Sequence, residues 1–175
     1  MQYPFLTAIL PALDPAKTPE MSVAELDEML KENLPAKESA KILSWDDPEK
    51  KDAFPLYTEM RRFTDCLNYR IALIRAEKLK SNDRFEMPDE LYAEIDFALS
   101  STANASALER EKIVDAACWR KLDDLEICHE MDLEHLAIYR LRLKMLEKYS
   151  GRDENTGRNN FEAALEKLAG KFNEP

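Results

Sequence analysis

Three side chains that could bind a metal lie close together in one stretch of the chain. Glu126 and His129 are three residues apart, and His135 follows six residues after His129. Helical di-iron proteins use a Glu-x-x-His unit of this kind to present a carboxylate and an imidazole on one helix face. They need it on two separate helices, whereas the only partial second copy, from Asp132 to His135, lies in the same stretch. We therefore predict no metal and no other cofactor, and we keep a small metal-dependent helical enzyme using Glu126, His129 and His135 as an alternative.

A second group of residues could bind a protein partner. Arg140, Lys144 and Lys148 recur every four residues, so a helix would place all three on one face. They could pair with acidic helices of the same protein, where an exposed pair stabilises by roughly a few tenths of a kcal/mol. They could instead dock an acidic surface of another protein. Surface charge stripes are common, which favours internal pairing, and Arg140, Lys144 and Lys148 remain the candidate partner-binding residues.

The scarcity of glycine excludes several catalytic and nucleotide-binding motifs. The sequence has three glycines, Gly151, Gly157 and Gly170, and none before residue 151. Phosphate-binding loops, dinucleotide-binding turns and nucleophile elbows all require glycine where the backbone turns sharply or approaches a ligand. Paired carboxylates are frequent, but a chain this rich in charge contains such pairs by chance. We find no catalytic motif and predict that the protein is not an enzyme.

The composition indicates one charge-rich globular domain. The chain has 175 residues, 45% of them hydrophobic and 34% charged, with a net charge of −10. A field of this sign repels phosphate, so we expect no general nucleic-acid binding. Three cysteines without a CxxC pair indicate reduced thiols, and the N-terminus lacks a basic region ahead of an apolar run. We therefore expect a cytoplasmic protein that is at most peripheral to a membrane.

Proline divides the chain into an irregular N-terminal third and a helical body, since seven of the nine prolines fall in residues 1–55. We expect one domain with an extended arm over residues 1–20, short helices and proline-broken loops over 21–54, and a helical body over 55–175. The apolar run of residues 5–10 could lie along the helices or form an edge strand that pairs with another chain. We favour the arm.

Local signals place the helices of the N-terminal half. A capping box formed by Ser22 and Glu25 predicts a helix to about residue 33. A short helix should follow over residues 36–45. Pro55 should begin a long helix that ends near residue 81, with an apolar stripe of Met60, Phe63, Leu67, Ile71 and Ile74.

Similar signals place the helices of the C-terminal half. Pro88 should begin a helix that buries Leu91, Ile95 and Leu99. Residues 105–149 could form one long bent helix or, as we prefer, two helices with a break near residues 129–132, where Asp132 would cap the second. A last helix is expected over residues 156–171. The predicted fold is therefore mainly all-α, an antiparallel bundle of about five to seven helices with the N-terminal arm beside it.

Three stretches share their order and pattern with one known family. Residues 3–13 form an aromatic run that ends in a Leu-Pro-x-Leu turn; residues 67–76 read LNYRIALIRA; residues 132–149 form a helix followed by Gly157 and Phe161. They resemble an uncharacterised bacterial family that is encoded in operons for V-type ATPases and described as similar to the ATPase C subunit. The family has no established catalytic residues, so none is implied here.

This resemblance implies a helical, non-catalytic protein in the region that couples the rotor stalk to the membrane ring. The chain is too small for a complete C subunit, so the resemblance implies an accessory or assembly component. Its partners would be stalk or ring subunits of the ATPase, at the inner face of the membrane. Homo-oligomers are also compatible with the sequence.

Overall fold

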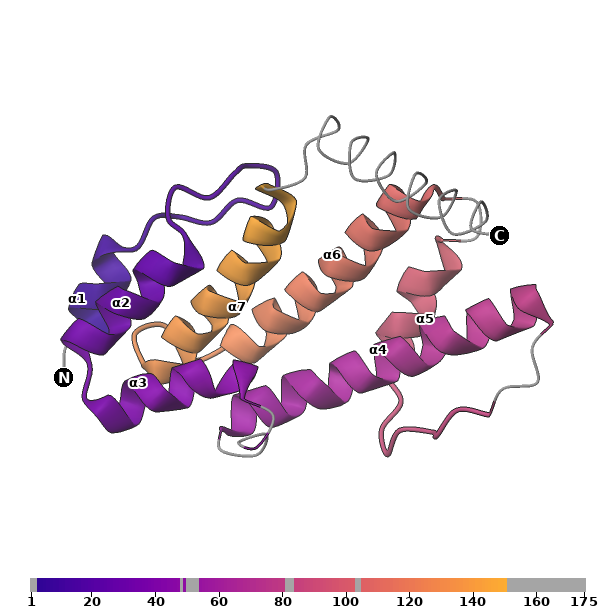
Figure 1. The fold of residues 1–175 in the computed structure, drawn as a ribbon, viewed down its shortest axis with the longest axis horizontal. Helices are drawn as coiled ribbons and strands as arrows, with labels where there is room; N and C mark the ends of the chain where they lie inside the picture. Colours follow the sequence, from indigo (N-terminus) through magenta and orange to yellow (C-terminus); the bar gives the residue numbers. More distant parts are fainter. Residues whose placement is uncertain (1–2, 48, 50–53, 81–83, 103–104, 151–175) are drawn as a thin grey trace, which may run out of the picture.

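The computed structural model describes residues 3–47, 49, 54–80, 84–102 and 105–150 (Figure 1). Within these residues the chain forms seven α-helices and one short 3-10 helix, and no strand: α1 (Tyr3–Ile9), α2 (Val23–Asn33), α3 (Ala36–Leu43), η1 (Ser44–Asp46), α4 (Pro55–Leu79), α5 (Ala93–Ser100), α6 (Ala107–Glu126) and α7 (Leu133–Ser150). The predicted all-α class is confirmed. None of the helices in this part of the chain combines the length and apolar character needed to cross a membrane.

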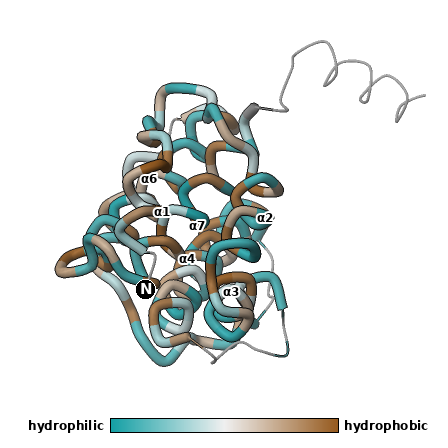
Figure 2. The backbone as a smooth tube through the Cα atoms, turned by 90° about the vertical axis from the view of Figure 1, so that its left-hand side faces the viewer, coloured by the Kyte–Doolittle hydropathy of each residue, from teal (hydrophilic) through white to brown (hydrophobic). Residues whose placement is uncertain are grey.

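Helix α7 is the centre of the core. Helices α1, α2, α3 and α6 all contact it, and Figure 1 shows α7 between α2 and α6. Leu136, Ile138 and Leu143 of α7 are completely buried. The helices labelled in Figure 2 carry both hydrophobic and hydrophilic positions, as packing of amphipathic helices requires. All six residues from 136 to 141 of α7 are buried, so this helix packs on several faces, and its charged residues need partners inside the fold.

The N-terminal segment begins with a helix, so the prediction of an extended arm or edge strand over residues 5–10 was wrong. Pro4 lies in the first turn of α1, where a missing backbone N–H costs no helical hydrogen bond. Leu6 is buried in the core, and α1 contacts α7. Burial of the apolar run against α7 thus selects a helix. Residues 11–14 have no regular secondary structure, and the Tyr139 hydroxyl donates a hydrogen bond to the Pro11 carbonyl at 2.9 Å.

The local signals of the N-terminal half are confirmed for α2, α3 and α4. The Ser22 hydroxyl accepts a hydrogen bond from the amide of Glu25, and the Glu25 carboxylate accepts one from the amide of Ser22 at 2.7 Å. Helix α3 ends at Leu43 and continues as the 3-10 helix η1. Helix α4 begins at Pro55 as predicted and runs for 25 residues.

Helix α5 begins later than predicted. The sequence suggested a start at Pro88 with Leu91 in the core, but the helix begins at residue 93 and Leu91 is 62% exposed. The cause is Tyr92, whose ring packs edge-on against the ring of Phe63 in α4, with the centroids 5.2 Å apart. The tyrosine hydroxyl also donates to the Glu90 carboxylate at 2.8 Å. These contacts hold residues 90–92 against α4 before the helix starts.

The break predicted near residues 129–132 is confirmed, because α6 ends at Glu126 and α7 begins at Leu133. Asp132 caps α7, with Oδ1 accepting a hydrogen bond from the amide of His135 at 3.0 Å. Cys128 adopts a left-handed φ of 74° in the connection, which turns the chain back on itself. The helix predicted over residues 156–171 lies outside the described residues.

Candidate functional site

The structure separates the histidines into two different contacts. Nδ1 of His135 lies 2.8 Å from Oε1 of Glu126, across the turn that joins α6 to α7. This Nδ1 atom is buried without an aligned hydrogen bond, so the contact is electrostatic and depends on protonation of the ring. Nδ1 of His129 instead lies 2.6 Å from Oδ2 of Asp132. Glu126, His129 and His135 are therefore not brought together as one set of ligands.

A different trio does approach within ligand distance of one another. Donor atoms of His129, Asp132 and Glu134 all lie within 4.8 Å, and the three residues are half-buried. Both oxygens of Asp132 are already engaged, one by His129 and the other by the amide that starts α7. Burial alone would raise the pKa of Asp132, but these two hydrogen bonds outweigh it and lower the pKa below its usual value. Capping of α7 therefore accounts for the arrangement.

We expect the His129–Asp132 pair to give the protein a pH-dependent stability near neutrality. The hydrogen bond that the ring donates to the Asp132 carboxylate raises the pKa of His129 above its usual 6.5. A raised pKa in the folded state means that the stabilisation is complete below pH 6.5 and is lost as the pH rises through the folded-state pKa. In urea denaturation across this range, His129→Gln should flatten the pH profile.

The matched variant Asp132→Ala removes both the pair and the cap of α7. It should lower the free energy of unfolding by about 1 kcal/mol where His129 is neutral, and by more where His129 is protonated and Asp132 is still ionised. An unchanged pH profile in His129→Gln would contradict the assignment.

The basic residues predicted to line one face of a helix are paired within the chain. The side chain of Arg140 is only 3% exposed. Its Nε and Nη2 atoms lie 2.6 and 2.8 Å from the two carboxylate oxygens of Asp27 in α2, and Nη2 lies 2.9 Å from Oδ2 of Asp46 in η1. Lys144 contacts the other oxygen of Asp46, and Lys148 lies 3.1 Å from Asp115 of α6.

These contacts correct the interpretation of Arg140, Lys144 and Lys148 as a docking stripe. The reason is burial: α7 is the central helix, so its cations face acidic residues of α2, η1 and α6. Arg140 is inaccessible to a partner, and the two lysines are engaged. Internal pairing, the interpretation favoured by the sequence, is the one observed.

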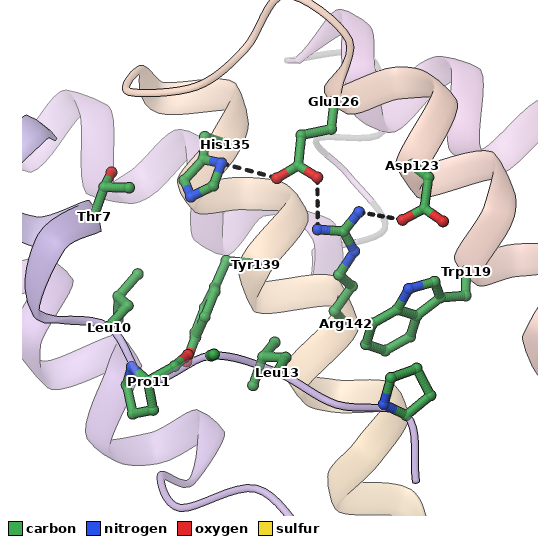
Figure 3. Close-up of a pocket in the computed structure, with 12 residues that line it drawn as sticks. Thr7, Leu10, Pro11, Leu13, Trp119, Asp123, Glu126, His135, Tyr139 and Arg142 are labelled. Carbon is green, nitrogen blue, oxygen red and sulfur yellow. Dashed lines mark hydrogen bonds and ion pairs between the residues drawn. The ribbon is translucent and has the colours of Figure 1, made fainter. Parts of the chain in front are cut away.

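A pocket of about 430 Å³ lies between the segment after α1 and the facing sides of α6 and α7 (Figure 3). At its centre Arg142 bridges two carboxylates of α6, with Nη2 2.5 Å from Asp123 and Nη1 2.7 Å from Glu126. The guanidinium carbon also lies 5.3 Å from the ring centroid of Trp119. His135 contacts Glu126 at the other end of the network, so the guanidinium of Arg142 and both carboxylates each have a partner within the pocket.

Exposed apolar side chains occur at several points along the α4–α5 half of the molecule, which lies away from α1 (Figure 1). They lie at the end of α4, in the segment that follows it and in α5: Leu79, Phe85, Met87, Leu91 and Phe97. Leu79 is 79% exposed and Phe97 is 73% exposed. Sequence reasoning missed this surface, since it assigned Ile71 and Ile74 to a buried stripe that is only half-buried there.

Comparison with known proteins adds one match. The family model described as "Protein of unknown function (DUF2764)" matches residues 72–171, more than half of the chain. The match begins in the second half of α4 and includes α5, α6 and α7. No curated protein and no solved structure gives a significant match.

Proposed function

The chain belongs to the DUF2764 family of proteins of unknown function, and from this premise we propose that it is a non-catalytic helical interaction protein. More specifically, we propose an accessory or assembly component associated with a V-type ATPase at the cytoplasmic face of the membrane. The observation that carries the interaction role is the set of large exposed apolar side chains on α4, on the segment that follows it and on α5. Single exposed apolar residues are ordinary, but a group of large ones on adjacent elements is typical of an interaction site.

The arrangement of ionisable groups also supports a non-catalytic role. Within the described residues, the hydrogen-bond and ion-pair partners of both histidine rings are carboxylates, and neither ring bonds a serine, threonine or cysteine that could act as a nucleophile. In the pocket around Arg142, the guanidinium and both carboxylates already contact one another. The ATPase association rests on the sequence resemblance carried by residues 3–13, 67–76 and 132–149.

The test is purification of the tagged protein from its own cells in mild detergent, followed by mass spectrometry. We expect stalk or ring subunits of a V-type ATPase in the bound fraction, and none with the same tag on an unrelated acidic protein of similar size. Recovery of the protein alone, with an intact ATPase in the unbound fraction, would contradict the association.

Metal analysis of the same preparation tests the alternative of a metal-dependent enzyme. We expect no stoichiometric iron, manganese or zinc, and an unchanged metal content in His129→Ala. A stoichiometric metal that this substitution removes would favour the enzyme.

A further inference from the structure

The second half of α4 has the composition of a buried helix but lacks the burial. Six of the nine residues from 71 to 79 are apolar: Ile71, Ala72, Leu73, Ile74, Ala76 and Leu79. With 3.6 residues per turn, these six point in all directions around the helix axis. Apolar side chains on several sides of a helix are normally enclosed by other elements, although Arg75, Glu77 and Lys78 interrupt them here. Here Leu67 is the last fully buried residue of α4, so the described part of the chain leaves this half incompletely covered.

The same region is basic in an acidic protein. Residues 70–84 contain five basic and two acidic residues, a net charge of +3 in a chain of −10. Arg75, Lys78, Lys80 and Arg84 are exposed, and none of them forms an ion pair with another residue that the structure describes. By contrast, the cations of α7 at positions 140, 142, 144 and 148 are all paired. We call the surface formed by residues 71–80, 84 and 85 the α4 tip; it carries four basic residues and one acidic residue, a net charge of +3.

We propose that the α4 tip binds an acidic amphipathic helix of a partner protein. This inference rests on the proposed interaction role and names the chemistry of the partner. An apolar face with a basic rim is complementary to a helix that has an apolar stripe flanked by Asp and Glu. A second copy of this chain is a poor occupant, because it would bring two surfaces of charge +3 together.

An anionic membrane fits the surface less well than a protein does. In the segment that follows the α4 tip, Glu86, Asp89 and Glu90 alternate with the exposed apolar residues Met87 and Leu91. Inserting these apolar side chains into an anionic bilayer would bring three carboxylates to the negative surface, which repels them. A protein partner can place its own cations opposite these carboxylates.

The first experiment uses the full chain with a photo-activated cross-linking amino acid in place of Leu79, expressed in its own cells. We expect a cross-link to a segment of another protein that is acidic and has helical apolar periodicity. The control carries the same group in place of Phe5, a side chain on α1 that is 59% exposed and lies at the opposite end of the molecule (Figure 1), and it should not form this product.

The second experiment reverses the charge of the tip. Arg75→Glu combined with Lys78→Glu should reduce the cross-link by about tenfold or more, since rim charges govern partner capture. The melting temperature should stay unchanged, because both side chains are exposed and neither forms an ion pair with another described residue. The matched control, Lys37→Glu with Lys41→Glu on α3, changes the net charge equally and should keep the cross-link. Replacing acidic residues of the captured partner segment with lysine should restore the cross-link in the variant that carries Arg75→Glu and Lys78→Glu.

Several outcomes would overturn this inference. One is a cross-link to a second copy of the chain, to lipid or to residues 151–175 of the same chain. Another is the absence of any cross-link. A third is sedimentation of the protein with phosphatidylserine vesicles that is lost when Arg75 and Lys78 are replaced. A cross-link to an acidic helix of a protein outside the ATPase would support the inference and contradict the proposed ATPase association. Capture of an ATPase subunit through a segment that is not acidic would support the ATPase association and contradict this inference.

Discussion

Replacing Arg140 with alanine is expected to lower the free energy of unfolding by about 3–5 kcal/mol. The guanidinium is the shared partner of Asp27 and Asp46 and is almost completely buried. Its removal leaves the Asp27 carboxylate, itself only 19% exposed, without a counter-charge. A folded domain is usually stable by only about 5–15 kcal/mol, so much of the stability should be lost. Urea denaturation followed by circular dichroism measures the effect.

Two further variants separate burial of charge from simple loss of a contact. Lys148→Ala breaks a pair that is 42% exposed on the lysine side and should cost less than about 1 kcal/mol. Combining Arg140→Met with Asp27→Asn removes both charges and should recover part of the stability lost in Arg140→Met alone. Equal losses in Arg140→Ala and Lys148→Ala would contradict this account of α7.

The Arg140 network also predicts a change in acid stability. Burial raises the pKa of Asp46, but hydrogen bonds from Lys144 and Arg140 outweigh this and hold the pKa below its usual value of 3.8. A lowered pKa in the folded state stabilises the protein above pH 3.8, and this contribution is lost as the pH falls through the folded-state pKa. The acid unfolding midpoint of Arg140→Ala should therefore move to higher pH than in the wild type.

Phe63→Ala is expected to cost about 3–5 kcal/mol as well, for a different reason. The ring is completely buried and joins three elements: it lies in α4, contacts Tyr92 before α5, and lies 5.8 Å from the Nζ atom of Lys121 in α6. Truncation leaves a cavity and removes the ring against which Tyr92 packs. Hydrogen exchange should show that α5 loses protection more than α2 does.

Phe97→Ala is the matched control because it removes the same ring from an exposed position on α5. It should change the free energy of unfolding by less than about 0.5 kcal/mol. If Phe97→Ala lowered the free energy of unfolding as much as Phe63→Ala, the region around Phe97 would be a packed core. The proposed interaction surface would then be wrong.

Features decided by neighbouring residues could be predicted from the sequence. The capping box at Ser22 and the cap at Asp132 form hydrogen bonds within three residues, so they are visible in the sequence and are found in the structure. Features decided by distant contacts could not be predicted. Helix α1 forms because Leu6 reaches the core around α7, and the late start of α5 depends on Tyr92 packing against Phe63, in a different helix.

The same distinction applies to the candidate sites. The four-residue spacing of Arg140, Lys144 and Lys148 indicates a shared face but not whether that face is exposed, since Asp27 lies 113 residues away in the sequence. Apolar periodicity correctly identified the inner side of α4 near Phe63. It could not indicate that the other elements cover only the first half of a 25-residue helix. The α4 tip becomes apparent only when composition and burial are compared.

The most direct test of the central claim, that this chain is an interaction component of a V-type ATPase, is the reciprocal purification. The ATPase would be isolated through a tag on a stalk subunit, and the amount of this chain would be measured by quantitative mass spectrometry. We predict a constant ratio of this chain to the stalk subunit, and a loss of the chain when it carries Arg75→Glu and Lys78→Glu. An intact ATPase that never contains this chain would contradict the claim.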